Sequence, residues 1–212
     1  MGRLEALAES VIKGDIDAAV TQTQGALDEG LDVQRIISDS LITAMDVVGE
    51  RFSKGQIFVP QMLRAAKTMQ QCMKLLEPFL KEGDVVPKGK VLIGTVRGDL
   101  HDIGKNLVAM MLDGAGFTVT DLGVDVSPET FVQKTQEVQP DILGMSALLS
   151  TTMPAMRQTI EALQKADLRD TCKVMIGGAP VTAKYAQEIG ADSYAPDAGS
   201  AVGEAKKLLG IS

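Results

Sequence analysis

Apolar residues in the first 82 positions recur every three to four residues, which is the spacing of amphipathic α-helices. Gly14 interrupts the first helical pattern, and Asp15 and Asp32 are placed to cap the second and third helices. Pro60 suits the first turn of a fourth helix, whose apolar stripe runs to Leu80. Four helices with short connections predict a small helical bundle.

From Lys90 onward, short apolar runs alternate with helical patterns, which indicates a parallel sheet with helices on both faces. We predict strands at 91–96, 118–122, 141–146 and 173–176, a weaker strand near 192–195, and helices near 103–115, 128–138, 153–166, 180–189 and 198–209. The predicted fold class is therefore α/β, with an N-terminal four-helix bundle and a flavodoxin-like, doubly wound, five-stranded parallel sheet. Residues 83–90 are rich in Pro, Gly and charge and form the predicted linker, so we expect domains at 1–85 and 86–212.

The chain has one His and two Cys in 212 residues, which limits its metal chemistry. Cys72 and Cys172 are too few and too far apart for a zinc site of two Cys and two His, or for a disulfide framework. We therefore expect a reducing compartment. A metal would need carboxylate ligands, or would arrive inside a cofactor that brings its own ligands.

The formal net charge of −7 opposes binding to a phosphate backbone, and no basic run offsets it. No apolar stretch reaches the ~18–20 residues of a membrane span. The N-terminus lacks the apolar core of a signal peptide. We expect a cytoplasmic protein that binds neither nucleic acid nor a membrane.

The loop after the first predicted strand is the expected site of chemistry, because ligands of doubly wound sheets bind beyond the carboxyl ends of the strands. It contains His101, with Asp99 two residues earlier, between Gly98 and Gly104. A carboxylate bound to one imidazole nitrogen fixes the tautomer and raises the basicity of the other nitrogen, as in metal-ligating histidines. An ordinary loop histidine, hydrogen-bonded to a neighbour, is the alternative. A Walker A loop is disfavoured, because five residues separate the two glycines and Asn106 replaces the hydroxyl residue.

The motif Asp99-x-His101-x-x-Gly104 resembles the cobalamin-binding signature of the corrinoid methyl-carrier proteins and of methionine synthase, and the resemblance covers nearly the whole chain. It implies a cobalamin or related corrinoid cofactor, in methyl, hydroxo or cobalt(II) form. His101 would be the lower axial ligand of cobalt, and Asp99 and Thr152 would form a hydrogen-bonded relay behind it. The cofactor-binding residues that the resemblance implies in this loop are Gly98, Leu100, Asp102, Ile103 and Gly104.

Two further segments resemble the same family at the ends of the third and fourth strands. Ser146, Leu148 and Ser150 fall in a segment like the family's Ser-x-Leu segment, and Gly177, Gly178 and Ala179 in one like its Gly-Gly segment. The resemblance implies that these residues contact the nucleotide tail of the cofactor. A bare backbone suits a ligand that lies against a sheet end, although a simple turn also explains a glycine pair.

The helical half resembles the family's cap over the methyl-bearing face of the corrin. Phe58 matches the aromatic residue just before the proline helix, and Met62, Ala65 and Met69 follow on that helix. The resemblance implies that these residues cover the corrin and exclude oxidants and protons. A methionine stripe at helical spacing also fits the core of a bundle.

The resemblance implies a cofactor-bearing subunit that carries a methyl group on cobalt between two enzymes. A substrate-specific methyltransferase would load the methyl group, and a methyl-acceptor methyltransferase would pass it to tetrahydrofolate, another pterin or a thiol. A reductive activator would be a third partner. The alternatives are a cobalamin-dependent sensor, the small subunit of a cobalamin-dependent mutase, and a flavodoxin-like interaction module without cofactor.

Overall fold

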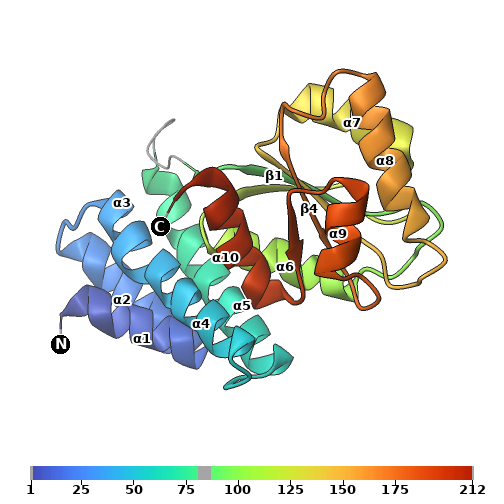
Figure 1. Cartoon of the computed structure of the whole chain (residues 1–212). Helices are drawn as coiled ribbons and strands as arrows, with labels where there is room; N and C mark the ends of the chain where they lie inside the picture. The colour runs from blue at the N-terminus through green and yellow to red at the C-terminus, as the bar shows by residue number, and fades with distance from the viewer. Residues whose placement is uncertain (1, 81–86, 212) are drawn as a thin grey trace. The chain divides into compact units, whose positions relative to one another are not determined.

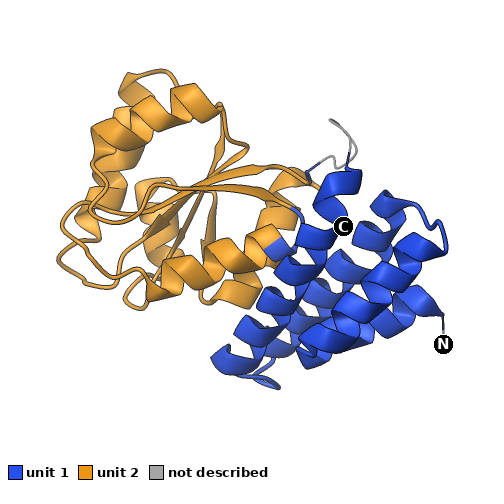
Figure 2. Cartoon of the chain, turned by 180° about the vertical axis from the view of Figure 1, so that it is seen from behind, with its two compact units in different colours: residues 1–87, 114–116 blue, residues 88–113, 117–212 orange. Residues whose placement is uncertain are grey.

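The computed structural model describes residues 2–80 and 87–211, and Figure 1 shows its helices and strands along the chain. The chain divides into two compact units, residues 1–87 with 114–116 and residues 88–113 with 117–212 (Figure 2). Residues 83–86 of the predicted linker lie outside the described residues. The predicted domain boundary between residues 85 and 86 also falls there and stays a prediction.

The first unit is helical, and it confirms the predicted four-helix bundle, since α3 and α4 are parts of one continuous helix. Its helices are α1 (Arg3–Lys13), α2 (Ile16–Asp28), α3 (Val33–Ile36), α4 (Thr43–Ser53) and α5 (Val59–Leu76). The carboxylates of Asp15 and Asp32 accept hydrogen bonds of 3.1 Å from the N–H groups of Ala18 and Arg35, so both residues cap their helices as the sequence predicts.

The predicted third helix is divided by a π-helical segment, Ile37–Ile42, that joins α3 to α4. The Ser40 hydroxyl donates to the Ile36 carbonyl within it. The predicted fourth helix ends at Leu76 rather than near Leu80. A 3₁₀ turn, Glu77–Phe79, follows it. Pro78 explains this difference, because a proline has no N–H to extend the α-helical bonding pattern.

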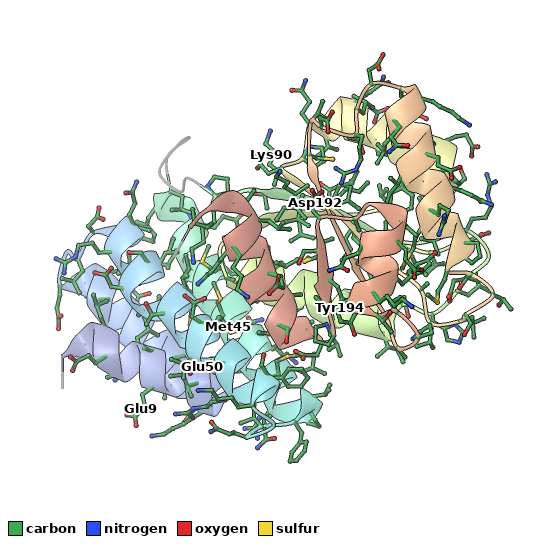
Figure 3. All side chains as sticks on the ribbon, in the orientation of Figure 1. Glu9, Met45, Glu50, Lys90, Asp192 and Tyr194 are labelled. Atoms are coloured by element: carbon green, nitrogen blue, oxygen red, sulfur yellow. The ribbon has the colours of Figure 1, made fainter. Side chains whose placement is uncertain are left out.

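Side chains divide between the inside and the outside of the bundle as amphipathic helices require. Leu7, Leu41 and Met62 are fully buried. Glu9 and Glu50 lie on the outer surface of their helices (Figure 3), where they pair with Lys13 and Lys54. None of the helices in the described residues is both long and apolar enough to cross a membrane.

The second unit is an α/β fold whose strands are all parallel, in the flavodoxin-like order β2-β1-β3-β4-β5 that we predicted. The strands are β1 (Lys90–Thr95), β2 (Thr118–Asp121), β3 (Ile142–Ser146), β4 (Lys173–Gly177) and β5 (Ser193–Ala195). The helices are α6 (Ile103–Gly114), α7 (Pro128–Val138), α8 (Pro154–Lys165), α9 (Ala183–Ile189) and α10 (Ala198–Leu209).

Both faces of this sheet are buried, which explains the continuous apolar runs in its strands. Leu92, Leu143 and Val174 pack on one face in a core cluster with side chains of α7, α8 and α9. The alternate strand residues, such as Val91 and Ile142, are also fully buried. Because β1, β3 and β4 are parallel neighbours, their carboxyl ends lie side by side at one edge of the sheet.

Candidate functional site

The candidate site lies where the loops after β1 and β3 meet. Thr95, the last residue of β1, pairs with Ser146, the last residue of β3. The N–H of Val96 continues the ladder by donating to the Ser146 carbonyl at 3.0 Å. The two loops thus leave the sheet side by side. This brings Asp99 within hydrogen-bond distance of Leu148, which lies 49 residues further along the chain.

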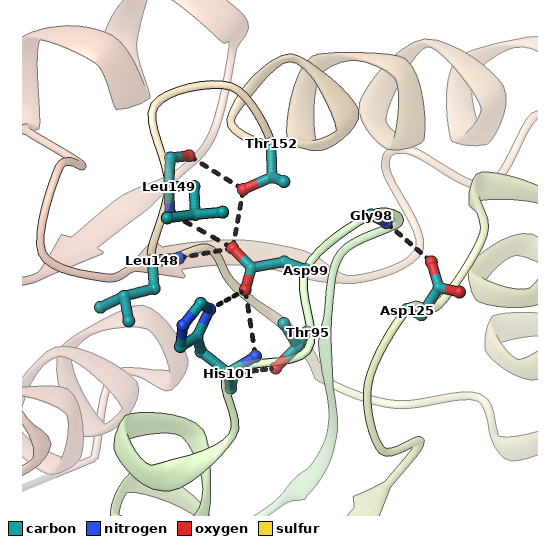
Figure 4. Close-up of polar contacts among 8 residues, drawn as sticks. All are labelled: Thr95, Gly98, Asp99, His101, Asp125, Leu148, Leu149 and Thr152. Atoms are coloured by element: carbon teal, nitrogen blue, oxygen red, sulfur yellow. Dashed lines mark hydrogen bonds and ion pairs between the residues drawn. The ribbon is translucent and has the colours of Figure 1, made fainter.

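Asp99 is fully buried, and both oxygens of its carboxylate accept hydrogen bonds (Figure 4). Oδ1 accepts from Nδ1 of His101 at 2.7 Å and from the His101 N–H at 3.1 Å. Oδ2 accepts from the Thr152 hydroxyl at 2.7 Å and from the N–H groups of Leu148 and Leu149 at 2.8 and 3.3 Å. The carboxylate therefore has no freedom to rotate without losing several bonds.

These bonds decide the protonation state of Asp99. Burial alone opposes ionisation of this carboxyl, but the hydrogen bonds from Thr152, from the ring and N–H of His101 and from the N–H of Leu148 outweigh it. Together they hold the pKa of Asp99 well below its usual range. Asp99 is thus a carboxylate at neutral pH and acts only as an acceptor.

His101 is held on one side and open on the other. Its side chain is 51% exposed, while its carbonyl accepts a 3.0 Å hydrogen bond from the hydroxyl of Thr95. Because the Asp99 carboxylate can only accept, Nδ1 carries the proton in the neutral imidazole and Nε2 keeps its lone pair. Nε2 faces away from Asp99 (Figure 4). This is the arrangement of a metal-ligating histidine with a carboxylate behind it.

The other predicted residues of this loop leave open space around His101. Leu100 and Ile103 are 72% and 76% exposed, and Leu148, on the facing loop, is 43% exposed. A Cβ added at Gly104 would meet nothing within 4 Å. Exposed large apolar side chains around a half-exposed imidazole suit an apolar, planar ligand. Asp102 instead holds its own helix, since its Oδ2 accepts from the Asn106 amide at 3.1 Å.

Ser146 ends β3, Ser150 lies in the loop that follows it, and the segment Gly177-Gly178-Ala179 begins at the last residue of β4. The structure gives a packing reason for the glycine pair. A Cβ at Gly178, where φ is +125°, would lie 1.9 Å from the Ala147 carbonyl oxygen, and one at Gly177 would lie 2.9 Å from the Ala195 carbonyl oxygen. Close approach of neighbouring loops therefore requires these glycines, whatever ligand lies beside them.

Sequence reasoning missed two polar residues beside this site. Lys105 is only 2% exposed, and its ammonium pairs with Asp121 at the end of β2 and donates to Asn106 Oδ1 at 2.6 Å. Asp125 binds the loop that carries Asp99, as described below. No periodicity marks a buried lysine in the first turn of a helix, so only tertiary structure identifies Lys105.

The four residues predicted to cap the corrin lie in the helical unit. Phe58 precedes α5 and is 70% exposed, and its N–H donates to Gln61 Oε1 at 2.8 Å. Met62, Ala65 and Met69 lie on the apolar face of α5 and are 0–6% exposed. Their burial fits the core of a bundle, and their contact with a cofactor stays a prediction.

Residues of this chain fit a cofactor that brings most of its own metal ligands. Within the described ranges, no group of three or more His, Cys, Asp and Glu side chains is arranged to hold a metal ion. The site offers one oriented imidazole nitrogen, two exposed apolar side chains on its own loop and open space at Gly104. A corrinoid, whose ring supplies four nitrogens to cobalt, needs one such ligand from the protein.

Comparison with known proteins gives two family matches, both described as a B12 binding domain, at residues 3–77 and 89–203. A corrinoid protein of Desulfitobacterium hafniense is 42% identical over 99% of both chains. Dimethylamine corrinoid protein 1 of Methanosarcina acetivorans is 44% identical over 97% of both chains, and the trimethylamine corrinoid protein of Methanosarcina barkeri is 41% identical over 96% of this chain.

Solved structures give the same result for the fold. A cobalamin-binding protein from Desulfitobacterium hafniense matches with a TM-score of 0.83 at 34% identity, over 97% of this chain and 98% of that one. The methanol:cobalamin methyltransferase complex of Methanosarcina barkeri matches with a TM-score of 0.88 at 28% identity, over 99% of this chain and 80% of that one. The resemblance first seen at Asp99-x-His101-x-x-Gly104 is confirmed: the chain belongs to the family of B12-binding corrinoid proteins, and its cofactor is a corrinoid.

Proposed function

We propose that this protein carries a methyl group on the cobalt of a corrinoid, with His101 Nε2 as the lower axial ligand. The observation that carries the proposal is the relay His101–Asp99–Thr152, in which a buried, ionised carboxylate orients a half-exposed imidazole at the carboxyl edge of the sheet. A bound corrinoid supplies a cobalt ion that can accept a methyl group and release it again.

The residues of the chain have separate tasks in this proposal. Asp99 fixes the His101 tautomer and raises the basicity of Nε2. The Thr152 hydroxyl and the N–H groups of Leu148 and Leu149 hold the Asp99 carboxylate in place. Leu100, Ile103 and Leu148 would give apolar contacts to the ring, and the ends of β3 and β4 would hold the nucleotide tail. As the family resemblance implies, Phe58, Met62, Ala65 and Met69 of the helical unit would form a cap that excludes water before transfer.

The partners in this proposal are enzymes that load and unload the methyl group. The names of the relatives, which are corrinoid proteins for dimethylamine and trimethylamine, and the methanol:cobalamin methyltransferase complex support a substrate-specific methyltransferase as the loading partner. We further propose a second methyltransferase that would pass the methyl group to tetrahydrofolate, another pterin or a thiol, and a reductive activator of the cofactor. The same names favour a carrier over a sensor or a mutase subunit.

Reconstitution tests this function directly. Apoprotein produced with nitrogen-15 histidine is loaded with cobalamin and reduced to cobalt(II), and the axial nitrogen splitting is recorded by electron paramagnetic resonance for the wild type and for His101→Ala. The label distinguishes a protein nitrogen from the nitrogen-14 of the cofactor's own base. Lys134→Ala, in the middle of α7, is the control. We expect the axial protein nitrogen in the wild type and the control and its loss in His101→Ala. An unchanged signal in His101→Ala would show that His101 is not the ligand.

Transfer itself is tested with the methylated protein. Candidate methyltransferases and acceptors are added under reducing conditions, and the methyl group is followed from cobalt to product. Release of the methyl group to an acceptor supports the carrier. If the group stays on cobalt with every methyltransferase and acceptor class named above, the carrier function is wrong.

A further inference from the structure

Asp125, in the loop between β2 and α7, binds the loop that holds Asp99 and His101. Its Oδ1 accepts a 2.7 Å hydrogen bond from the N–H of Gly98 (Figure 4), and its own N–H donates to the Asp99 carbonyl at 3.0 Å. These two bonds connect to the residue before Asp99 and to Asp99 itself. Asp125 thus holds the main chain at the point from which the Asp99 side chain projects.

The backbone at this contact is unusual on both sides. Asp125 has a φ of +53° and Gly98 a φ of +82°, both in the left-handed region. Aspartate and asparagine are among the few residues with a side chain that adopt this region readily. The residue type at position 125 therefore serves two requirements, a left-handed backbone and a carboxylate acceptor aimed at Gly98.

The loop that carries Asp125 is itself fixed to the end of β1. The N–H of Thr95 donates to the Gly123 carbonyl at 2.9 Å, and the N–H of Val126 donates to the Thr95 carbonyl at 2.9 Å. At the other end of the same turn, the Gly123 N–H donates to Asp121 Oδ1 at 2.8 Å. The position of Asp125 is therefore fixed by main-chain hydrogen bonds between its loop and the end of β1.

The side chain and the main chain of Asp99 are thus held by two different loops, which follow β3 and β2. The β3 loop holds the carboxylate through Leu148, Leu149 and Thr152, while the β2 loop holds the backbone through Asp125. Loss of the Gly98 bond would let the main chain at Asp99 rotate relative to the carboxylate contacts. The N–H and Nδ1 of His101 both bond to Oδ1 of Asp99. A rotation at Asp99 would move this oxygen and so lengthen the hydrogen bond from Nδ1.

We propose that Asp125 is a positioning residue that sets the orientation of the His101 imidazole through the backbone of Gly98 and Asp99. Its effect on cobalt ligation rests on the proposed function, whereas its effect on the imidazole belongs to the cofactor-free protein. The two effects can therefore be measured separately.

The first experiment uses apoprotein labelled with nitrogen-15 histidine. The chain has 1 His, so the ring signals belong to His101 without further assignment. At a pH where the imidazole is neutral, the chemical shifts of the two ring nitrogens report the tautomer. We expect the Nδ1–H tautomer to dominate in the wild type and a mixture of both tautomers in Asp125→Gly, which keeps the left-handed backbone and removes the acceptor.

Three variants make this result specific. Asp125→Asn keeps both the backbone preference and an acceptor oxygen, so it should restore the wild-type ring signals. Asp125→Ala removes the acceptor in a different backbone background and should shift the signals in the same direction as Asp125→Gly. Glu129→Gln breaks the exposed Arg97–Glu129 ion pair, which joins the loop after β1 to the first turn of α7, and should change nothing. Wild-type ring signals in both Asp125→Gly and Asp125→Ala would overturn the proposal.

The second experiment loads the same variants with cobalamin and measures the fraction of cobalt(II) that has an axial protein nitrogen. We expect this fraction to fall about threefold or more in Asp125→Gly, the scale of one lost hydrogen bond, and to recover in Asp125→Asn. If the wild type lacks the axial nitrogen, the proposed function fails, and the tautomer measurement still decides the role of Asp125. An axial fraction unchanged in Asp125→Gly would overturn the positioning role.

Discussion

The hydroxyl of Thr152 donates to Asp99 Oδ2 at 2.7 Å across 53 residues of sequence, in a position where both side chains are buried. This bond joins the start of α8 to the loop after β1. Thr152 therefore stabilises the α/β unit, and through Asp99 it also helps to orient His101.

Replacing Thr152 by Val removes the hydroxyl and keeps the shape. We expect the free energy of unfolding to fall by about 2 kcal/mol, because a buried carboxylate loses a charge-assisted hydrogen bond. Thr152→Ser keeps the hydroxyl and should cost clearly less. Urea unfolding of the apoprotein measures both. A free energy of unfolding in Thr152→Val equal to that of the wild type would mean that the hydroxyl contributes no stability at this position.

The depressed pKa of Asp99 predicts a specific dependence of stability on pH. Since the folded pKa lies below the unfolded value of about 3.9, the contribution of Asp99 is fully present above that value. It is lost as the pH falls toward the folded pKa, and its scale is about 2 kcal/mol. Urea unfolding of the apoprotein across this acid range measures the loss.

Asp99→Asn is the matched variant for this prediction. It should be less stable than the wild type at neutral pH, and the difference between the two should shrink as the pH falls below about 4. A constant difference over that range would contradict the assignment of this pH dependence to Asp99.

The buried pair of Lys105 and Asp121 predicts unequal costs for its two partners. The Lys105 side chain is 1% exposed, while that of Asp121 is 37% exposed. Asp121→Ala leaves a buried ammonium whose remaining hydrogen bond, among the described residues, is to the Asn106 amide oxygen, and we expect a loss of about 2 kcal/mol. Lys105→Met leaves a carboxylate that water can reach and should cost less than about 1 kcal/mol. Chemical unfolding of the two variants checks this order, and the reverse order would contradict it.

Two glycines near the site should respond differently to alanine. Gly178→Ala would place a Cβ 1.9 Å from a backbone oxygen at a φ of +125°, so we expect the α/β unit to lose several kcal/mol, about 3 or more. Gly104→Ala meets nothing within 4 Å and lies in α6, so the apoprotein should be as stable or slightly more stable.

Gly104→Ala should nevertheless weaken cobalamin binding, because the added methyl group occupies the space that the proposed ring approaches. Thermal unfolding of the apoprotein and titration with cobalamin separate the two effects. Normal affinity in Gly104→Ala would mean that the cofactor does not approach this residue.

The sequence predicted the central strands well because β1, β3 and β4 are short, buried apolar runs, and α7, α9 and α10 begin at the capping residues Ser127, Thr182 and Asp197. Predicted and observed helices agree at 128–138 and 198–209, and the strand order follows from the five-strand alternation. The π-helical segment at Ile37–Ile42 could not be predicted, because the apolar stripe of that helix continues through it. Pro78 indicates the end of α5 at Leu76, but our prediction gave more weight to the apolar spacing, which continues to Leu80.

For the site, the sequence predicted His101, Asp99 and Thr152 through a short motif and a family resemblance. It could not predict Asp125 or Lys105, because their partners lie in other segments, Gly98 in the loop after β1 and Asp121 at the end of β2. It also could not distinguish a ligand from packing as the reason for Gly178, which depends on the distance to Ala147.

The most direct test of the account is isotopic. The protein is produced with nitrogen-14 or nitrogen-15 histidine, loaded with cobalamin, reduced to cobalt(II) and examined by electron paramagnetic resonance. Because the chain has 1 His, only His101 carries the label. If His101 is the axial ligand, each cobalt line should change from a triplet to a doublet on labelling. A splitting pattern that is identical in both samples would contradict cobalt ligation by His101.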